Sequence, residues 1–149
     1  MPIGDICVRD VVTATRDTTI EEAAQLMRTN HVGDLLVVEG VNGSRTPLGI
    51  VTDRDIVVSV VALQLDPAVL SVGDVMGPDL EMASENQGVF ETIQQMRAAG
   101  VRRMPVVNRQ QSLVGIISVD DLLQLLAEEM GEMAKLISRE QRKEAHARR

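Results

Sequence analysis

Two short stretches of the 149-residue chain place a hydroxyl three residues before a carboxylate, Thr52 with Asp55 and Ser118 with Asp121. Each pair follows an apolar stretch that favours a strand and precedes a helical pattern, so the hydroxyl is expected beside unpaired backbone N–H groups where a helix begins. Such a place favours a phosphate, and a carboxylate one turn later can accept hydrogen bonds from a ribose diol. The same spacing is also typical of a capping box that only begins a helix, so both interpretations stay open.

Both pairs belong to a larger repeat, because the chain carries the same order of signals twice. The spacing of equivalent signals differs by a few residues, and each difference falls at a loop position, where folds tolerate insertions. The sequence therefore predicts a tandem duplication. The equivalent positions are Asp10-Val11 and Asp74-Val75, Met27-Arg28 and Met96-Arg97, Val37-Val38 and Val106-Val107, Gly49-Ile50 and Gly115-Ile116, and Asp55 and Asp121.

The first copy is predicted to contain two helices and two strands. A capping box of Thr18 and Glu21 is expected to begin the first helix, which carries apolar side chains at helical spacing. Two short apolar runs flank a hairpin signal at Asn42, Gly43 and Ser44. The predicted elements are a helix over 19–30, strands over 35–38 and 47–52, and a helix from 52 to about 62.

The second copy repeats this order after a linker over residues 64–71. Its first helix contains Val89, Ile93 and Met96 and is expected to end at Gly100, the residue type that most readily adopts the left-handed conformation of a helix end. The remaining predicted elements are a strand over 103–107, a turn over 108–111, a strand over 112–118 and a helix from 120.

The motif order resembles that of CBS domains, and the chain resembles a stand-alone CBS pair over roughly residues 5–128. The resemblance is carried by a Gly, three further residues with Thr or Ser last, and an Asp three positions on, found in register at Gly49 to Asp55 and Gly115 to Asp121. It implies an α/β (α+β) fold with two β-α-β-β-α repeats around a pseudo-two-fold axis. It also implies two clefts between them that bind adenine nucleotides or adenosyl ligands. The predicted divisions are a first repeat over 1–66, a second over 67–130 and a C-terminal helical extension with a basic tail over 131–149.

The resemblance also implies where further residues lie. It brings Arg102 and Arg103 to the cleft of Thr52 and Asp55, although exposed arginines at a strand edge are commonly only solvated. In the other cleft it brings Gly33 and Asp34 to Ser118 and Asp121, and a carboxylate repels phosphate. We therefore expect unequal clefts, of which the arginine-containing one fills first. The predicted nucleotide-binding residues are Gly33, Thr52, Asp53, Arg54, Asp55, Arg102, Arg103, Ser118 and Asp121.

The C-terminal helix is predicted to continue past the end of its counterpart in the first copy. Its apolar residues step by four and three, as in a heptad seam: Val119, Leu123, Leu126, Met130, Met133 and Ile137. We expect the first members in the core and the last three against another subunit or partner. The basic tail, residues 139–149, is interpreted as a helix end whose cations suit the helix dipole, rather than as a nucleic-acid or membrane contact.

Composition disfavours several classes of function. A net charge of −7 and the lack of Tyr and Trp argue against nucleic-acid binding. One cysteine, Cys7, and two histidines, His31 and His146, give neither a metal-ligand spacing nor a catalytic arrangement, and no apolar run is long enough to span a membrane. We expect a cytoplasmic, homodimeric regulatory module, not an enzyme, that needs no cofactor or metal and senses an adenine nucleotide for a protein the sequence does not identify. The alternative is a ligand-independent dimerisation or scaffold module.

Overall fold

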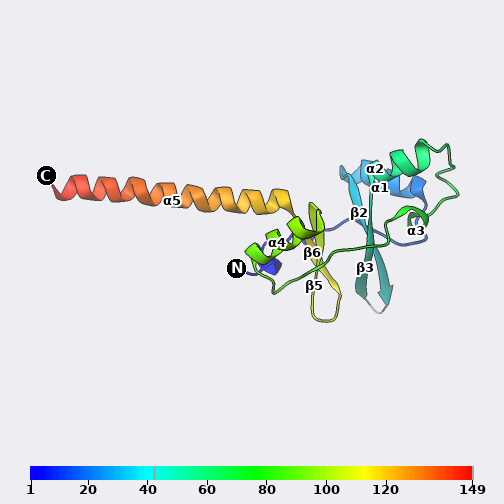
Figure 1. Ribbon diagram of the computed structural model, residues 1–149, viewed down its shortest axis with the longest axis horizontal. Helices are drawn as coiled ribbons and strands as arrows, with labels where there is room; N and C mark the ends of the chain where they lie inside the picture. The colour runs from blue at the N-terminus through cyan, green and yellow to red at the C-terminus, as the bar shows by residue number, and fades with distance from the viewer. Residues whose placement is uncertain (42, 149) are drawn as a thin grey trace.

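The computed structural model describes residues 1–41 and 43–148, which form two three-stranded sheets covered by helices (Figure 1). In each sheet the first strand is parallel to the second, and the second is antiparallel to the third. The elements are η1 (Ile3–Asp5), β1 (Thr13–Ala14), α1 (Ile20–Asn30), β2 (Asp34–Val41), β3 (Ser44–Thr52), α2 (Asp53–Ile56), η2 (Val57–Val61), α3 (Val72–Val75), β4 (Ala83–Ser84), α4 (Val89–Ala99), β5 (Arg103–Val107), β6 (Leu113–Ser118) and α5 (Val119–Ala147).

The predicted duplication and the α/β fold of two β-α-β-β-α repeats are confirmed. Even the irregularities match, because the register shifts between Val37 and Val38 in one sheet and between Val106 and Val107 in the other. The hairpin strands β2 and β3 extend further than the apolar runs indicated, since pairing continues to Val41 and Ser44. Of the predicted hairpin turn, Gly43 has a φ of 80°, and Asn42 lies outside the described residues.

The helix ends follow from local hydrogen bonds. Thr19 caps α1 by accepting the N–H of Glu22 at 3.1 Å, so the predicted capping box of Thr18 and Glu21 was wrong by one residue. The Thr18 hydroxyl instead accepts the N–H of Thr15 at 3.1 Å, in the turn before the helix. At the end of α4, Gly100 adopts a φ of 69°, as its residue type predicted.

Each sheet has its own hydrophobic core, and each core also contains a residue from a segment outside its own repeat. The first contains α1, β2, β3 and also Val72 of α3, which follows the linker; the second contains α4, β5, β6 and also Ile3 of η1 at the start of the chain. Ile3 and Val72 are both fully buried. Backbone pairing fixes the exchange, since the N–H of Ile3 donates to Gln87 O at 2.8 Å and the N–H of Val72 donates to Thr18 O at 2.7 Å.

The helix α5 begins in the second core and then leaves it. Leu122 is buried in that core, whereas Leu123 is exposed, so the prediction that Leu123 packs inside was wrong. Beyond its first two turns α5 projects away from both sheets, and its C-terminal end is the far end of the molecule (Figure 1). In the described part of the chain, no helix has the length and apolar character required to span a membrane.

Candidate ligand site between the repeats

Two cavities are lined by residues from both repeats, and we name them by the charges they contain. The basic cavity has a volume of about 570 Å³, and the acidic cavity about 290 Å³. The basic cavity is lined by Gly33, Ile50, Thr52, Asp53, Arg54, Val101, Arg102 and Arg103. The acidic cavity is lined by Val8, Asp10, Val11, Val12, Val32, Asp34, Arg103, Ile116, Ser118, Asp120 and Asp121.

The two predicted hydroxyl–carboxylate pairs each form a capping box at a strand-to-helix junction. Thr52 Oγ1 accepts the N–H of Asp55 at 3.1 Å, and the Asp55 carboxylate accepts the N–H of Thr52 at 2.9 Å. Ser118 Oγ accepts the N–H of Asp121 at 3.2 Å, and the Asp121 carboxylate accepts both the N–H and the hydroxyl of Ser118, at 3.0 and 2.8 Å. The capping interpretation therefore holds for both pairs.

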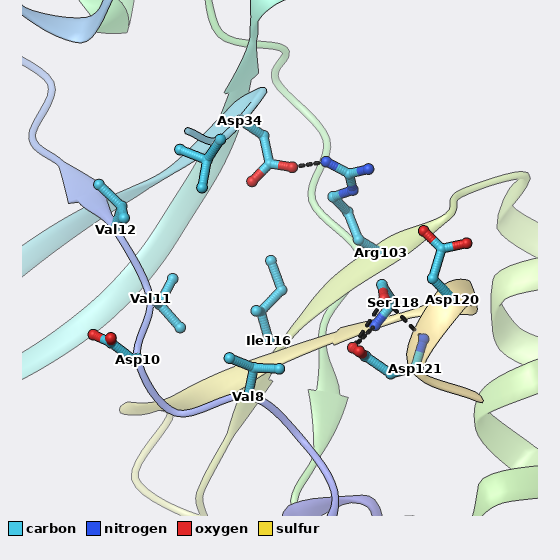
Figure 2. Close-up of a pocket in the computed structure, with 11 residues that line it drawn as sticks. Val8, Asp10, Val11, Val12, Asp34, Arg103, Ile116, Ser118, Asp120 and Asp121 are labelled. Atoms are coloured by element: carbon cyan, nitrogen blue, oxygen red, sulfur yellow. Dashed lines mark hydrogen bonds and ion pairs between the residues drawn. The ribbon is translucent and has the colours of Figure 1, made fainter. Parts of the chain in front are cut away.

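The two carboxylates differ in where they lie. Asp121 lines the acidic cavity beside Ser118 (Figure 2). Asp55 does not line the basic cavity, although its partner Thr52 does. Instead Asp53, the first residue of α2, lines that cavity and donates its backbone N–H to Gly33 O at 2.9 Å. Asp53 is thus better placed than Asp55 to meet a ligand in the basic cavity.

Two arginines of the second repeat pair with carboxylates that line the acidic cavity. Arg103 forms an ion pair with Asp34, which comes from the start of β2 in the first repeat (Figure 2). The resemblance implied that Arg103 belongs to the cleft of Thr52 alone. In the structure Arg103 lines both cavities. Arg102 approaches Asp120 at 3.7 Å, and both of these side chains are about three-quarters exposed. Asp34 is consequently a partly neutralised carboxylate rather than a bare repulsive charge.

The charges of the cavities are opposite in balance. Three guanidinium groups and one carboxylate, those of Arg54, Arg102, Arg103 and Asp53, line the basic cavity. Four carboxylates and one guanidinium line the acidic cavity, and the remaining lining there is aliphatic apart from Ser118. Guanidinium groups match phosphate oxygens in geometry and charge, whereas four carboxylates oppose a phosphate. The expected inequality of the two clefts therefore has a basis in the lining residues.

Sequence reasoning missed one wall of the acidic cavity. Val8, Asp10 and Val11 reach it from the segment between η1 and β1, where Val8 pairs with Ile116 of β6 through two backbone hydrogen bonds of 2.9 Å (Figure 2). The signal was present, since Asp10-Val11 marks the duplication, but the sequence does not show that this segment crosses to the second repeat.

At two positions near the cavities, neighbouring atoms come so close to the backbone that only glycine fits without a shift. A Cβ on Gly33 would come within 3.1 Å of an Asp53 carboxylate oxygen, and one on Gly115 within 2.5 Å of Val8 O. Cys7 lies at this same crossing, outside both cavities, and burial raises the pKa of its thiol. Among the described residues there is no group of three or more His, Cys, Asp or Glu that could hold a metal ion.

The sequence profile of the CBS domain matches residues 3–62 and 72–128. The chain belongs to the CBS-domain family. Protein MK0525 of Methanopyrus kandleri is 32% identical over 83% of this chain, which spans 61% of that protein's length. CBS domain-containing protein YhcV of Bacillus subtilis is 34% identical over 80% of this chain and 81% of its own. The match to inosine-5'-monophosphate dehydrogenase of Methanocaldococcus jannaschii covers only 22% of that enzyme.

Solved structures of CBS proteins share this fold. The hexameric CBS-CP12 protein of bloom-forming cyanobacteria superposes with a TM-score of 0.70 at 30% identity, over 83% of this chain and 66% of that one. The CBS pair of protein MJ0100, solved in complex with 5'-methylthioadenosine and S-adenosyl-L-methionine, superposes with a TM-score of 0.71 at 23% identity, over 85% and 99%. The family resemblance inferred from the sequence is thus confirmed.

Proposed function

We propose that this CBS pair is a regulatory module that senses an adenine nucleotide or a related adenosyl compound in the cavities between its repeats. The observation that carries the proposal is the basic cavity, because three arginines from both repeats line it together with Thr52 and Asp53 at the start of α2. A module that binds a ligand between its halves can change their relative stability or arrangement, and so report occupancy to a regulated protein.

The lining of the basic cavity suits the two parts of a nucleotide. Arg54, Arg102 and Arg103 supply donors for phosphate oxygens. Ile50 and Val101 supply aliphatic surface against which an adenine ring can pack. Aliphatic side chains must take this role because the chain has no Tyr or Trp to stack on the ring. Thr52 and Asp53 add polar atoms at the edge of the cavity. The adenosyl ligands of the MJ0100 CBS pair support this class of ligand.

We expect the acidic cavity to bind nucleotides more weakly. Its Asp10, Asp34, Asp120 and Asp121 oppose phosphate, and Arg103, which pairs with Asp34, is the one arginine among its lining residues. A charge-assisted hydrogen bond contributes about 1.5 to 3 kcal/mol, so the difference between the cavities corresponds to tenfold or more in affinity. An adenosyl ligand without phosphate, or with a positive charge, fits the acidic cavity better.

Calorimetric titration of the purified protein with AMP, ADP, ATP, 5'-methylthioadenosine and S-adenosyl-L-methionine tests the proposal. Arg102→Ala should weaken the tightest phosphorylated ligand about tenfold or more. Arg109→Ala is the matched control, because Arg109 is exposed in a turn and lines neither cavity. No heat and no thermal shift with any of these compounds at millimolar concentration would overturn the proposal and favour a ligand-independent scaffold.

We also propose that the module is a homodimer. Apolar side chains are exposed on the outer helices of both repeats, among them Val57, Val58 and Val61 of η2 and Phe90 of α4. Exposed apolar patches of this kind commonly mark an interface. The hexameric assembly of the CBS-CP12 protein supports self-association. Light scattering should give twice the chain mass of 16.2 kDa, and a mass of 16.2 kDa at all micromolar concentrations would contradict the proposal.

A further inference from the structure

The part of α5 from residue 127 onward, called here its second half, is not covered by any other part of the described chain. Every residue from 127 to 147 is exposed. Four large apolar side chains nevertheless project from it, Met130, Met133, Leu136 and Ile137, with exposed fractions between 56% and 70%. We call these four residues together with Leu126 the α5 seam.

An isolated helix of this kind is marginally stable in water, because most helix stability in proteins comes from packing an apolar face. Residues spaced by three and four, as in the α5 seam, lie on one side of a helix and are typical of a coiled-coil contact. The other positions of the second half are mostly polar, and the ion pairs of Lys135 with Glu132 and of Arg148 with Glu144 are exposed. The spacing therefore indicates a second helix against the α5 seam.

The charges along α5 select the direction of that second helix. Residues 119–133 contain five acidic side chains and no basic one, whereas residues 134–147 contain four basic and two acidic side chains. Two parallel copies would place acidic halves together and basic halves together. Two antiparallel copies place each acidic half beside a basic half, so charge complementarity favours an antiparallel second copy of this chain.

We infer that α5 pairs with α5 of a second copy in an antiparallel coiled coil. The register that buries the α5 seam sets Leu126 opposite Ile137 of the second copy and Met130 opposite its Met133. It also brings the basic end of each helix to the first turn of the other, where Asp120 and Asp121 lie. The inference rests on the proposed self-association and adds to it the surface and the orientation.

An apolar cavity at the start of α5 continues the α5 seam. It has a volume of about 390 Å³ and lies where α4 and α5 meet. Leu126 belongs both to this cavity and to the α5 seam, and Phe90, the chain's one aromatic residue, lines the cavity while 77% exposed. In the antiparallel pair the helix of the second copy passes this cavity after its Ile137, so one continuous apolar surface is covered.

Disulfide trapping in the full chain tests the orientation. Two single-cysteine chains are made in a Cys7→Ser background, one with Leu126→Cys and one with Ile137→Cys, and one of them carries a tag that changes its mass. After mixing and mild oxidation, the antiparallel pair predicts a disulfide between a Leu126→Cys chain and an Ile137→Cys chain. It predicts few disulfides between two copies of the same variant. In the antiparallel register two copies of position 137 are about 16 Å apart along the helix axis, too far for a disulfide. Ser138→Cys in place of Ile137→Cys is the control off the α5 seam and should give little mixed product.

A second variant measures the seam itself. Ile137→Asp should lower the mass found by light scattering toward 16.2 kDa at low micromolar concentration, because it buries a charge in the pair. Ser138→Asp adds the same charge one residue along and should leave the dimer intact. In the trapping experiment, disulfides that mainly join two copies of the same cysteine variant would overturn the antiparallel orientation. A dimer that survives Ile137→Asp would overturn the role of α5 and leave self-association standing, and a wild-type monomer would overturn both.

Discussion

Arg103 connects the two cavities at the level of a single side chain. It lines both of them, and its ion pair with Asp34 joins the start of β5 in one repeat to the start of β2 in the other. Both side chains are partly buried, so water screens this pair less than the exposed pair of Arg102 and Asp120. A phosphate that binds Arg103 must compete with Asp34 for the same guanidinium group.

Asp34→Asn should therefore strengthen the binding of phosphorylated adenine nucleotides. The amide keeps the shape of the side chain but removes the charge that holds Arg103, and we expect the dissociation constant of ATP to fall several-fold in calorimetric titration. Asp79→Asn is the matched control, because Asp79 is exposed and lines neither cavity. Weaker ATP binding by Asp34→Asn would mean that Asp34 positions Arg103 for the ligand rather than competing with it.

The reactivity of the Cys7 thiol should depend on both folding and pH. Burial raises the pKa of its thiol, so the fraction of reactive thiolate at pH 7 to 8 is lower in the folded protein than in the unfolded chain. Iodoacetamide should react with Cys7 several-fold more slowly in the native protein than in guanidinium chloride, and the native rate should increase as the pH rises. Equal rates in both states at pH 7.5 would show that the folded protein does not protect the thiol.

The crossing of the N-terminal segment over β6 depends on Gly115. A Cβ at this position would come within 2.5 Å of Val8 O and 2.8 Å of Cys7 Sγ, and Val8 forms the two backbone hydrogen bonds that hold the segment to Ile116. Gly115→Ala should thus displace the segment and lower the free energy of unfolding by about 1 to 3 kcal/mol.

Gly131→Ala provides the control for that substitution. A Cβ on Gly131 would meet nothing within 4 Å, and alanine stabilises a helix interior relative to glycine by about 1 kcal/mol. Urea unfolding followed by circular dichroism should show a lower midpoint for Gly115→Ala and an unchanged or higher midpoint for Gly131→Ala. Equal midpoints would contradict the close approach at Gly115.

Local signals predicted most elements, and long-range contacts account for what they missed. The hydroxyl–carboxylate spacing located the starts of α2 and α5, and Gly100 located the end of α4. The pattern misplaced the cap of α1 because Thr18 and Thr19 are adjacent and both of a capping type. It predicted a helix to about residue 62 but not that the five residues of η2, which continue α2, are π-helical. It also did not predict the crossing that brings Val8 to the acidic cavity.

The sequence predicted which residues lie at the site better than it predicted the contacts between them. Thr52, Arg102 and Arg103 line the basic cavity, as the resemblance implied. Gly33 was expected in the cleft of Ser118 and Asp121, and that prediction was wrong, because Gly33 O accepts the N–H of Asp53 and Gly33 lines the basic cavity. The sequence did not indicate that Arg103 pairs with Asp34, because an ion pair between repeats depends on how the two sheets are set against each other. The sequence also did not show that Asp55 lies outside the lining of the basic cavity, whereas Asp121, which forms the same capping box, lines the acidic cavity.

At the scale of the whole molecule, the exchange of segments makes the two repeats depend on each other. The first core is complete only with residues of α3, which follow the linker, and the second core only with Ile3, Ile6 and Cys7 from the start of the chain. The sheets also meet directly, through β3 and β6 and a hydrogen bond between the hydroxyls of Ser44 and Ser112. A cut in the linker therefore does not separate two intact folding units.

Fragments of the chain test this dependence. A fragment of residues 1–65 ends before α3, lacks Val72, and carries Ile3 without the core that buries it, so we expect it to lose cooperative thermal unfolding. A fragment of residues 9–76 contains every side chain of the first core and omits η1, so it should unfold cooperatively. Mixing 1–65 with 66–149 should restore cooperative unfolding, because each fragment supplies the segment that the other core lacks. If 1–65 unfolds as cooperatively as 9–76 when each is heated alone and followed by circular dichroism, the exchanged segments contribute little to stability, and the repeats are independent.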